Sequence, residues 1–153
     1  MTDSALLAAF EQHEHSSKDF HFNVGPADTG GEPTPWDSAV FAEQLRKDLE
    51  AVLSLTFDVS RGIVDPTGGC TYWFESGERS VSLQVSDPEE GDPFPFGKVP
   101  ALLIIRSRSE EVATWELAAG LYRDLCSLGR YLVLAETKHG DLVTGNFDVG
   151  DGW

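Results

Sequence analysis

The sequence predicts an α+β fold with a single, mostly antiparallel sheet and two main helices packed on one face of it. One basis is the order of the expected elements, which runs helix, strands, hairpin, strand, helix and hairpin. Another is the alternation in residues 80–86, where Val81, Leu83 and Val85 face one way and serines and a glutamine face the other. A strand with one polar face implies a sheet that is partly open to water.

The N-terminal part of the chain is predicted to contain a short helix over residues 4–14 and a brief strand over residues 20–24. The first 45 residues contain eight acidic residues and a single basic one. We therefore expect residues 1–35 to form an acidic arm of a single domain that spans residues 1–153.

A second helix is predicted to begin after Asp37, because an aspartate at the N-cap accepts hydrogen bonds from the first turn. Trp36 before it and Phe41 within it have the spacing of a hydrophobic staple. A strand over residues 55–59 and a turn-rich connector over residues 61–69 are expected to follow. The apolar face of this helix consists of Phe41, Leu45, Leu49, Val52 and Leu53.

Residues 70–86 are typical of a β-hairpin with Gly77 in its turn. In the first strand of this hairpin, Tyr72 and Phe74 alternate with Trp73. If the first two aromatic side chains pack into the core, the tryptophan lies on the open face of the sheet.

The best-defined unit is residues 99–136, which are predicted to form a strand, a helix and a second strand. The continuous apolar run of residues 101–105 favours a central strand that is covered on both faces. Ser107 and Glu110 have the spacing of a capping box and predict the start of the helix, and Gly129 is placed to end it. A second hairpin is expected to turn at the sequence KHGD.

Charge is the strongest global signal. The chain carries 26 acidic and 11 basic residues, a formal net charge of −15, and its pI is near 4.4. This balance argues against binding to nucleic acid or to anionic membranes, and it favours a cationic partner. No apolar run is long enough for a membrane span, and the N-terminus lacks the pattern of a signal peptide, so a cytoplasmic protein with reduced cysteines is expected.

A long loop over residues 86–100 contains four prolines, four acids and two phenylalanines. Loops of this length within a compact domain are often functional. We predict that it forms one continuous partner-binding surface with the exposed tryptophan, made up of Trp73, Asp87, Glu89, Glu90, Asp92, Phe94 and Phe96. In the alternative interpretation, the two phenylalanines only fix the loop to the sheet edge.

Signatures of catalysis are absent from the sequence, including those of nucleotide-binding loops and serine hydrolases. The His-Glu-His run at residues 13–15 does not form a metal site on a helix, because side chains two residues apart point away from each other. We expect no metal and no cofactor. A small hydrolase that uses the carboxylates of residues 87–92 is the enzymatic alternative, although such groups normally need an enclosed pocket.

In size, charge and element order, the chain resembles two bacterial classes: small acidic immunity proteins that neutralise a toxin, and acidic secretion chaperones. The first resemblance implies an inhibitor of a cationic toxin such as a nuclease, and the second implies an apolar contact surface. We expect a non-enzymatic protein that binds a basic protein partner, with the chaperone as the alternative. We also expect a homodimer, because the apolar run of residues 101–105 needs cover on both faces and only two helices are available to provide it. In the alternative, the N-terminal arm provides the missing cover.

Overall fold

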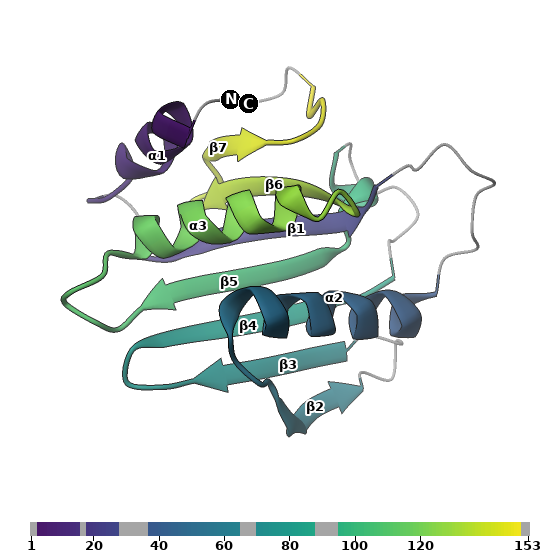
Figure 1. The fold of residues 1–153 in the computed structure, drawn as a ribbon. Coiled ribbons are helices and arrows are strands. Elements are labelled where there is room, and N and C mark those ends of the chain that lie inside the picture. The colour runs from purple at the N-terminus through teal and green to yellow at the C-terminus, as the bar shows by residue number, and fades with distance from the viewer. Residues whose placement is uncertain (1–2, 16–17, 28–36, 65–69, 88–94, 151–153) are drawn as a thin grey trace.

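The computed structural model describes residues 3–15, 18–27, 37–64, 70–87 and 95–150. Three α-helices and one sheet form this part of the chain (Figure 1). The helices are α1 (Asp3–Glu11), α2 (Ser38–Leu53) and α3 (Thr114–Ser127), and a short 3-10 helix, η1, covers Phe96–Lys98. The strands are β1 (Phe20–Pro26), β2 (Asp58–Val64), β3 (Cys70–Glu75), β4 (Arg79–Val85), β5 (Ala101–Ser107), β6 (Tyr131–Thr137) and β7 (Leu142–Gly145).

The sheet has seven strands in the order β2-β3-β4-β5-β1-β6-β7, and every neighbouring pair is antiparallel. The predicted α+β fold is therefore confirmed. The expected central strand, β5, has three strands on each side. Strand β1 lies between β5 and β6, so the N-terminal segment forms part of the middle of the sheet.

The helices lie on one face of the sheet, with α2 over β3 and β4 and α3 over β5, β1 and β6 (Figure 1). The core fills the space between the two layers. Helix α1 joins this layer through Phe10, whose ring centroid lies 5.5 Å from that of Phe20 and 6.3 Å from that of Phe22. Both β1 rings are fully buried, which explains why the N-terminal segment is held inside the sheet.

The other face of the sheet carries no helix among the described residues. In β5, Ala101, Leu103 and Ile105 face the helices and are buried, whereas Leu102 and Ile104 are only half-buried. The expectation that this strand is covered on both faces was therefore wrong. Neighbouring side chains on adjacent strands shield the second face only in part. We call this uncovered side the open face.

Two predicted boundaries also differ from the structure. Helix α3 begins at Thr114, because Ser107 is the last residue of β5 and its hydroxyl donates to the carbonyl oxygens of Ser109 and Val112. That hydroxyl is therefore used within the loop rather than in a helix cap. Strand β2 begins at Asp58, later than expected, and includes residues that were assigned to a connector.

The predicted cap of α2 is confirmed, since the Asp37 side chain accepts hydrogen bonds from two backbone N–H groups of the first turn. Further along α2, Asp48 accepts hydrogen bonds from the Tyr131 hydroxyl and the Arg130 guanidinium, which ties the helix to the start of β6. Burial, with Asp48 alongside, raises the pKa of Tyr131 and keeps the phenol a donor.

Both hairpins lie where the sequence places them, β3–β4 around Gly77 and β6–β7 around Gly140. Gly129 follows α3 in the left-handed conformation, as expected for a residue that ends a helix. Cys126 is a free thiol. None of the helices in the described residues has the length and apolar character needed to cross a membrane.

Candidate partner-binding surface

Register places one row of side chains across the open face. Trp73 of β3 pairs with Asp58 of β2 on one side and with Ser82 of β4 on the other. The row continues through Ile104 and His21, which pair with each other across β5 and β1. Directly paired residues of an antiparallel sheet point to the same face. The β3–β4 hairpin and the pairing of β5 with β4 and β1 set the register of this row. The position of Trp73 therefore depends on several strands of the sheet.

Trp73 is the large apolar residue that this row exposes. Its side chain is 40% exposed, whereas its neighbours Tyr72 and Phe74 point to the helix face and pack against the core. The ring centroid of Tyr72 lies 6.2 Å from that of buried Phe57. Leu7 and Val40, the other exposed large apolar side chains in the described residues, lie on helices. The sheet therefore presents one exposed aromatic ring, on the face that no described helix covers.

Two hollows flank this ring. The central hollow, of about 300 Å³, lies over β4 and β5, and the edge hollow, of about 260 Å³, lies toward the edge strand β2. Trp73 and Glu75 line both. The remaining lining of the central hollow is Asp19, Ser80, Val81, Ser82, Ile104, Arg106 and Arg108, and that of the edge hollow is Thr56, Asp58 and Phe74.

Charge in the central hollow is balanced within the chain. The guanidinium of Arg106 donates to the carboxylate of Asp19, and an Arg108 nitrogen lies 3.6 Å from a Glu75 oxygen. Both members of the second pair are about half exposed, at 46% and 47%. Water screens such a pair, so it is weak and open to exchange with another charged group. The two arginines therefore balance the two carboxylates, and the hollow carries no net charge.

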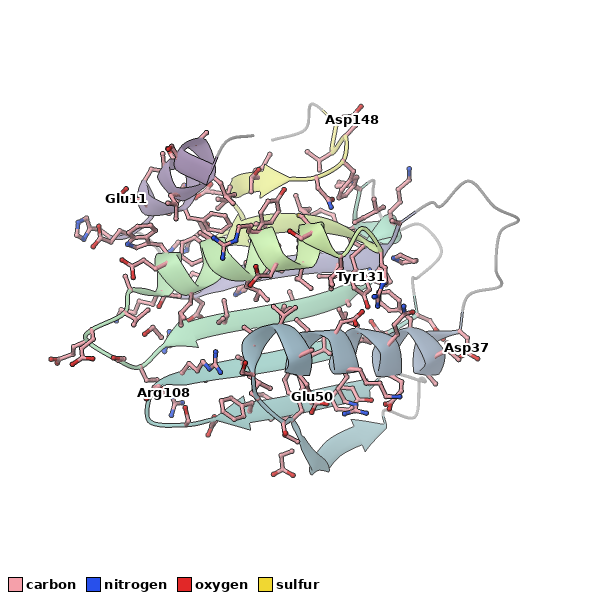
Figure 2. All side chains as sticks on the ribbon, viewed as in Figure 1. Glu11, Asp37, Glu50, Arg108, Tyr131 and Asp148 are labelled. Carbon is pink, nitrogen blue, oxygen red and sulfur yellow. The ribbon has the colours of Figure 1, made fainter. Side chains whose placement is uncertain are left out.

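One end of the sheet carries most of the exposed acids of the described residues. We call it the turn end, because the β3–β4 turn, the β5–α3 loop and the β6–β7 hairpin lie there. Helix α1 also ends there, and Figure 2 shows Glu11 and Arg108 at this end. Five arginines of the described chain are ion-paired with its own acids. Exposed turn-end acids that form no ion pair with a described lysine or arginine are Glu11, Glu14, Glu78, Glu110, Glu111, Glu116 and Asp141.

The predicted surface is only partly within the described residues. Trp73 lies on the open face and Asp87 is exposed just after β4, at the end of the sheet opposite the turn end. Phe96 is half-buried in η1, which packs against β1, and β4 and β5 separate that strand from β3. The structure therefore does not bring Phe96 to Trp73. Four predicted members lie outside the described residues: Glu89, Glu90, Asp92 and Phe94.

Sequence reasoning missed several residues of the two hollows. Glu75 could have been found, because it follows Trp73 by two positions on the same strand and so shares its face. Asp58 could not, since its position beside Trp73 depends on a strand whose start and register local patterns did not give. Asp19 and the two arginines come together only through the insertion of β1 next to β5.

Other parts of the described chain offer little chemistry. No group of three or more His, Cys, Asp or Glu in the described residues is placed to hold a metal ion. A cavity of about 410 Å³ between α1, α3 and β7 contains Tyr122 and Cys126. Burial raises the pKa of Tyr122 to about 12 and also raises that of the Cys126 thiol, so both stay protonated near neutral pH. A protonated thiol is a poor nucleophile.

Compared with models of protein families, with curated proteins and with solved structures, the chain matches none of them.

Proposed function

We propose that this chain is a binding protein that engages a basic protein partner through the open face around Trp73 and the acidic turn end. In this proposal its biological role is that of an inhibitor or immunity protein for a cationic toxin such as a nuclease. The observation that carries the proposal is an exposed tryptophan on the open face of a chain with a net charge of −15. Aromatic anchors with a charged rim are typical of binding hot spots.

The distribution of charge supports the same function. Because most described arginines are paired within the chain, the acids at the turn end remain to attract a cationic surface. Opposite charges speed diffusional encounter, especially at low ionic strength. An acidic surface can also occupy a basic cleft that would otherwise hold phosphates. The charges of the central hollow are balanced, so we expect this hollow to contact an uncharged part of the partner's surface.

Capture from native lysate tests the proposal. The immobilised chain should retain a basic protein at low salt and release it at moderate salt, because screening weakens charge-driven binding. Retention of an extended apolar segment that salt does not release would instead indicate a secretion chaperone. If no protein is retained and turnover of a small molecule that depends on residues 87–92 is found, the proposal is wrong and the hydrolase alternative is correct.

A further inference from the structure

The central hollow has a floor of two small side chains on β4. Ser82 lies between Trp73 of β3 and Ile104 of β5 in one row of the open face. Ser80 lies in the next row, between charged residues of the same two strands. Directly paired residues point to the same face, so larger side chains stand on both sides of the serines. The hollow, of about 300 Å³, is the space that the two small side chains leave over β4.

The floor of the hollow can form hydrogen bonds that the described chain does not use. Ser80 and Ser82 are half-buried, and neither side-chain hydroxyl forms a hydrogen bond with another described residue. A serine hydroxyl can donate one hydrogen bond and accept others. A purely apolar ligand would remove these hydroxyls from water and give them no partner, which costs binding free energy. The floor therefore favours a ligand that carries a polar group.

Charge in the walls of the hollow favours a neutral ligand. The Arg106 guanidinium is paired with the Asp19 carboxylate. The Arg108 guanidinium is paired with that of Glu75 in the same way, at 3.6 Å between nitrogen and oxygen. A charged side chain that entered the hollow would compete with one of these pairs, whereas a neutral ring leaves both in place. Guanidinium groups also interact favourably with the faces of aromatic rings, so the walls suit an uncharged aromatic ring.

Size and chemistry together fit a phenol. Binding pockets for drug-sized molecules have volumes of about 300–1,000 Å³, and the central hollow lies at the lower end of this range. It therefore has room for one ring rather than for a larger ligand. A phenyl ring would leave the two serine hydroxyls without partners. A tyrosine hydroxyl can both donate to them and accept from them, and a tyrosine ring can pack against Trp73 in an offset or edge-to-face arrangement.

We propose that the central hollow receives one tyrosine side chain of the basic partner. Its ring packs between Trp73 and Ile104, and its hydroxyl forms hydrogen bonds with Ser80 and Ser82. This inference rests on the proposed function and deepens it, because it names the chemical group that the open face recognises. The acidic turn end attracts many basic proteins, whereas the hollow selects one that presents a tyrosine at this position.

Titration with small probes tests the hollow without the partner. N-acetyl-tyrosine amide should shift the Trp73 indole N–H signal in NMR spectra in a saturable manner, with the signal identified by its loss in Trp73→Phe. N-acetyl-phenylalanine amide lacks only the hydroxyl and should bind about 2- to 10-fold more weakly. In the double variant Ser80→Ala with Ser82→Ala, the two probes should bind equally. No shift with the tyrosine probe, equal binding of the two probes to the wild-type chain, or an unchanged difference in the double variant would overturn the inference.

Filling the hollow from its floor gives a second test. Ser82→Leu places a large side chain between Trp73 and Ile104 and should abolish binding of the tyrosine probe. Gln84→Leu is the matched control, because residue 84 lies on the same face of β4, is exposed and does not line the hollow. The control should bind the probe as the wild-type chain does. Binding that survives Ser82→Leu, or that Gln84→Leu abolishes equally, would contradict the assignment.

The same two variants separate this inference from the proposed function. A captured basic partner should dissociate about tenfold faster or more from Ser82→Leu than from Gln84→Leu, because the tyrosine loses its place in the complex. Equal dissociation rates would refute the role of the hollow and leave the proposed function intact. If the wild-type chain captures no basic protein, the proposed function fails, and the probe titration alone then decides whether the hollow binds a phenol.

Discussion

Replacing Trp73 with alanine will raise the dissociation constant for the basic partner about 30-fold or more, which corresponds to about 2 kcal/mol. The loss is expected in the dissociation rate, because the ring makes contacts within the formed complex and contributes little to long-range attraction. Fold stability should change little, since the side chain is 40% exposed and lies outside the core between sheet and helices. Surface plasmon resonance on the captured partner gives both rate constants.

Tyr72→Ala is the matched control, because Tyr72 precedes Trp73 in the same strand and points to the opposite face. This change removes an aromatic contact with Phe57 and should lower the free energy of unfolding while leaving the affinity of the folded fraction unaltered. Equal affinities of wild type and Trp73→Ala would refute the proposed surface. A loss in binding that merely follows the unfolded fraction would refute it as well.

Replacing Gly25 with alanine will destabilise the fold by about 3 kcal/mol. A Cβ atom at this position would lie 1.8 Å from the Lys98 carbonyl oxygen and 3.0 Å from the Val99 Cα. These are backbone atoms of the segment that leads from η1 into β5, so they move only if that segment shifts. Val99 is itself 3% exposed, which leaves little room for such a shift. Urea denaturation measures the change in the free energy of unfolding.

Gly77→Ala provides the control for this change, because a Cβ atom there meets nothing within 4 Å. Its expected effect is a small stabilisation of about 0.5 kcal/mol, since alanine restricts the unfolded chain. If Gly25→Ala and Gly77→Ala have the same free energy of unfolding, the segment before β5 does not pack closely against β1.

Local patterns in the sequence predicted much of the fold. Asp37 as a helix cap and the two hairpins were correct because each depends on neighbouring residues alone. The capping-box spacing after β5 failed because the hydroxyl of Ser107 found acceptors in the following loop. Insertion of β1 between β5 and β6 was beyond local patterns, since strands far apart in the chain pair through the completed core.

For the candidate site too, local patterns predicted some features, whereas others depend on the pairing of distant strands. Alternation in β3 was enough to place Trp73 on the face of the strand opposite that of Tyr72 and Phe74. The acidic neighbours of Trp73 were sought in the loop that follows β4, which leaves the sheet at the end opposite the turn end. Instead, Asp58 reaches the ring through strand pairing, which no spacing in the sequence shows.

The most direct test of a charge-driven complex is the salt dependence of its association rate. Stopped-flow mixing with the captured partner should show that the rate constant falls about tenfold or more between about 20 mM and about 300 mM salt. A triple variant, Glu78→Gln with Glu110→Gln and Glu111→Gln, should associate more slowly at low salt and show a flatter dependence. An association rate that does not change with salt in the wild-type chain, or a triple variant identical to it, would contradict the account.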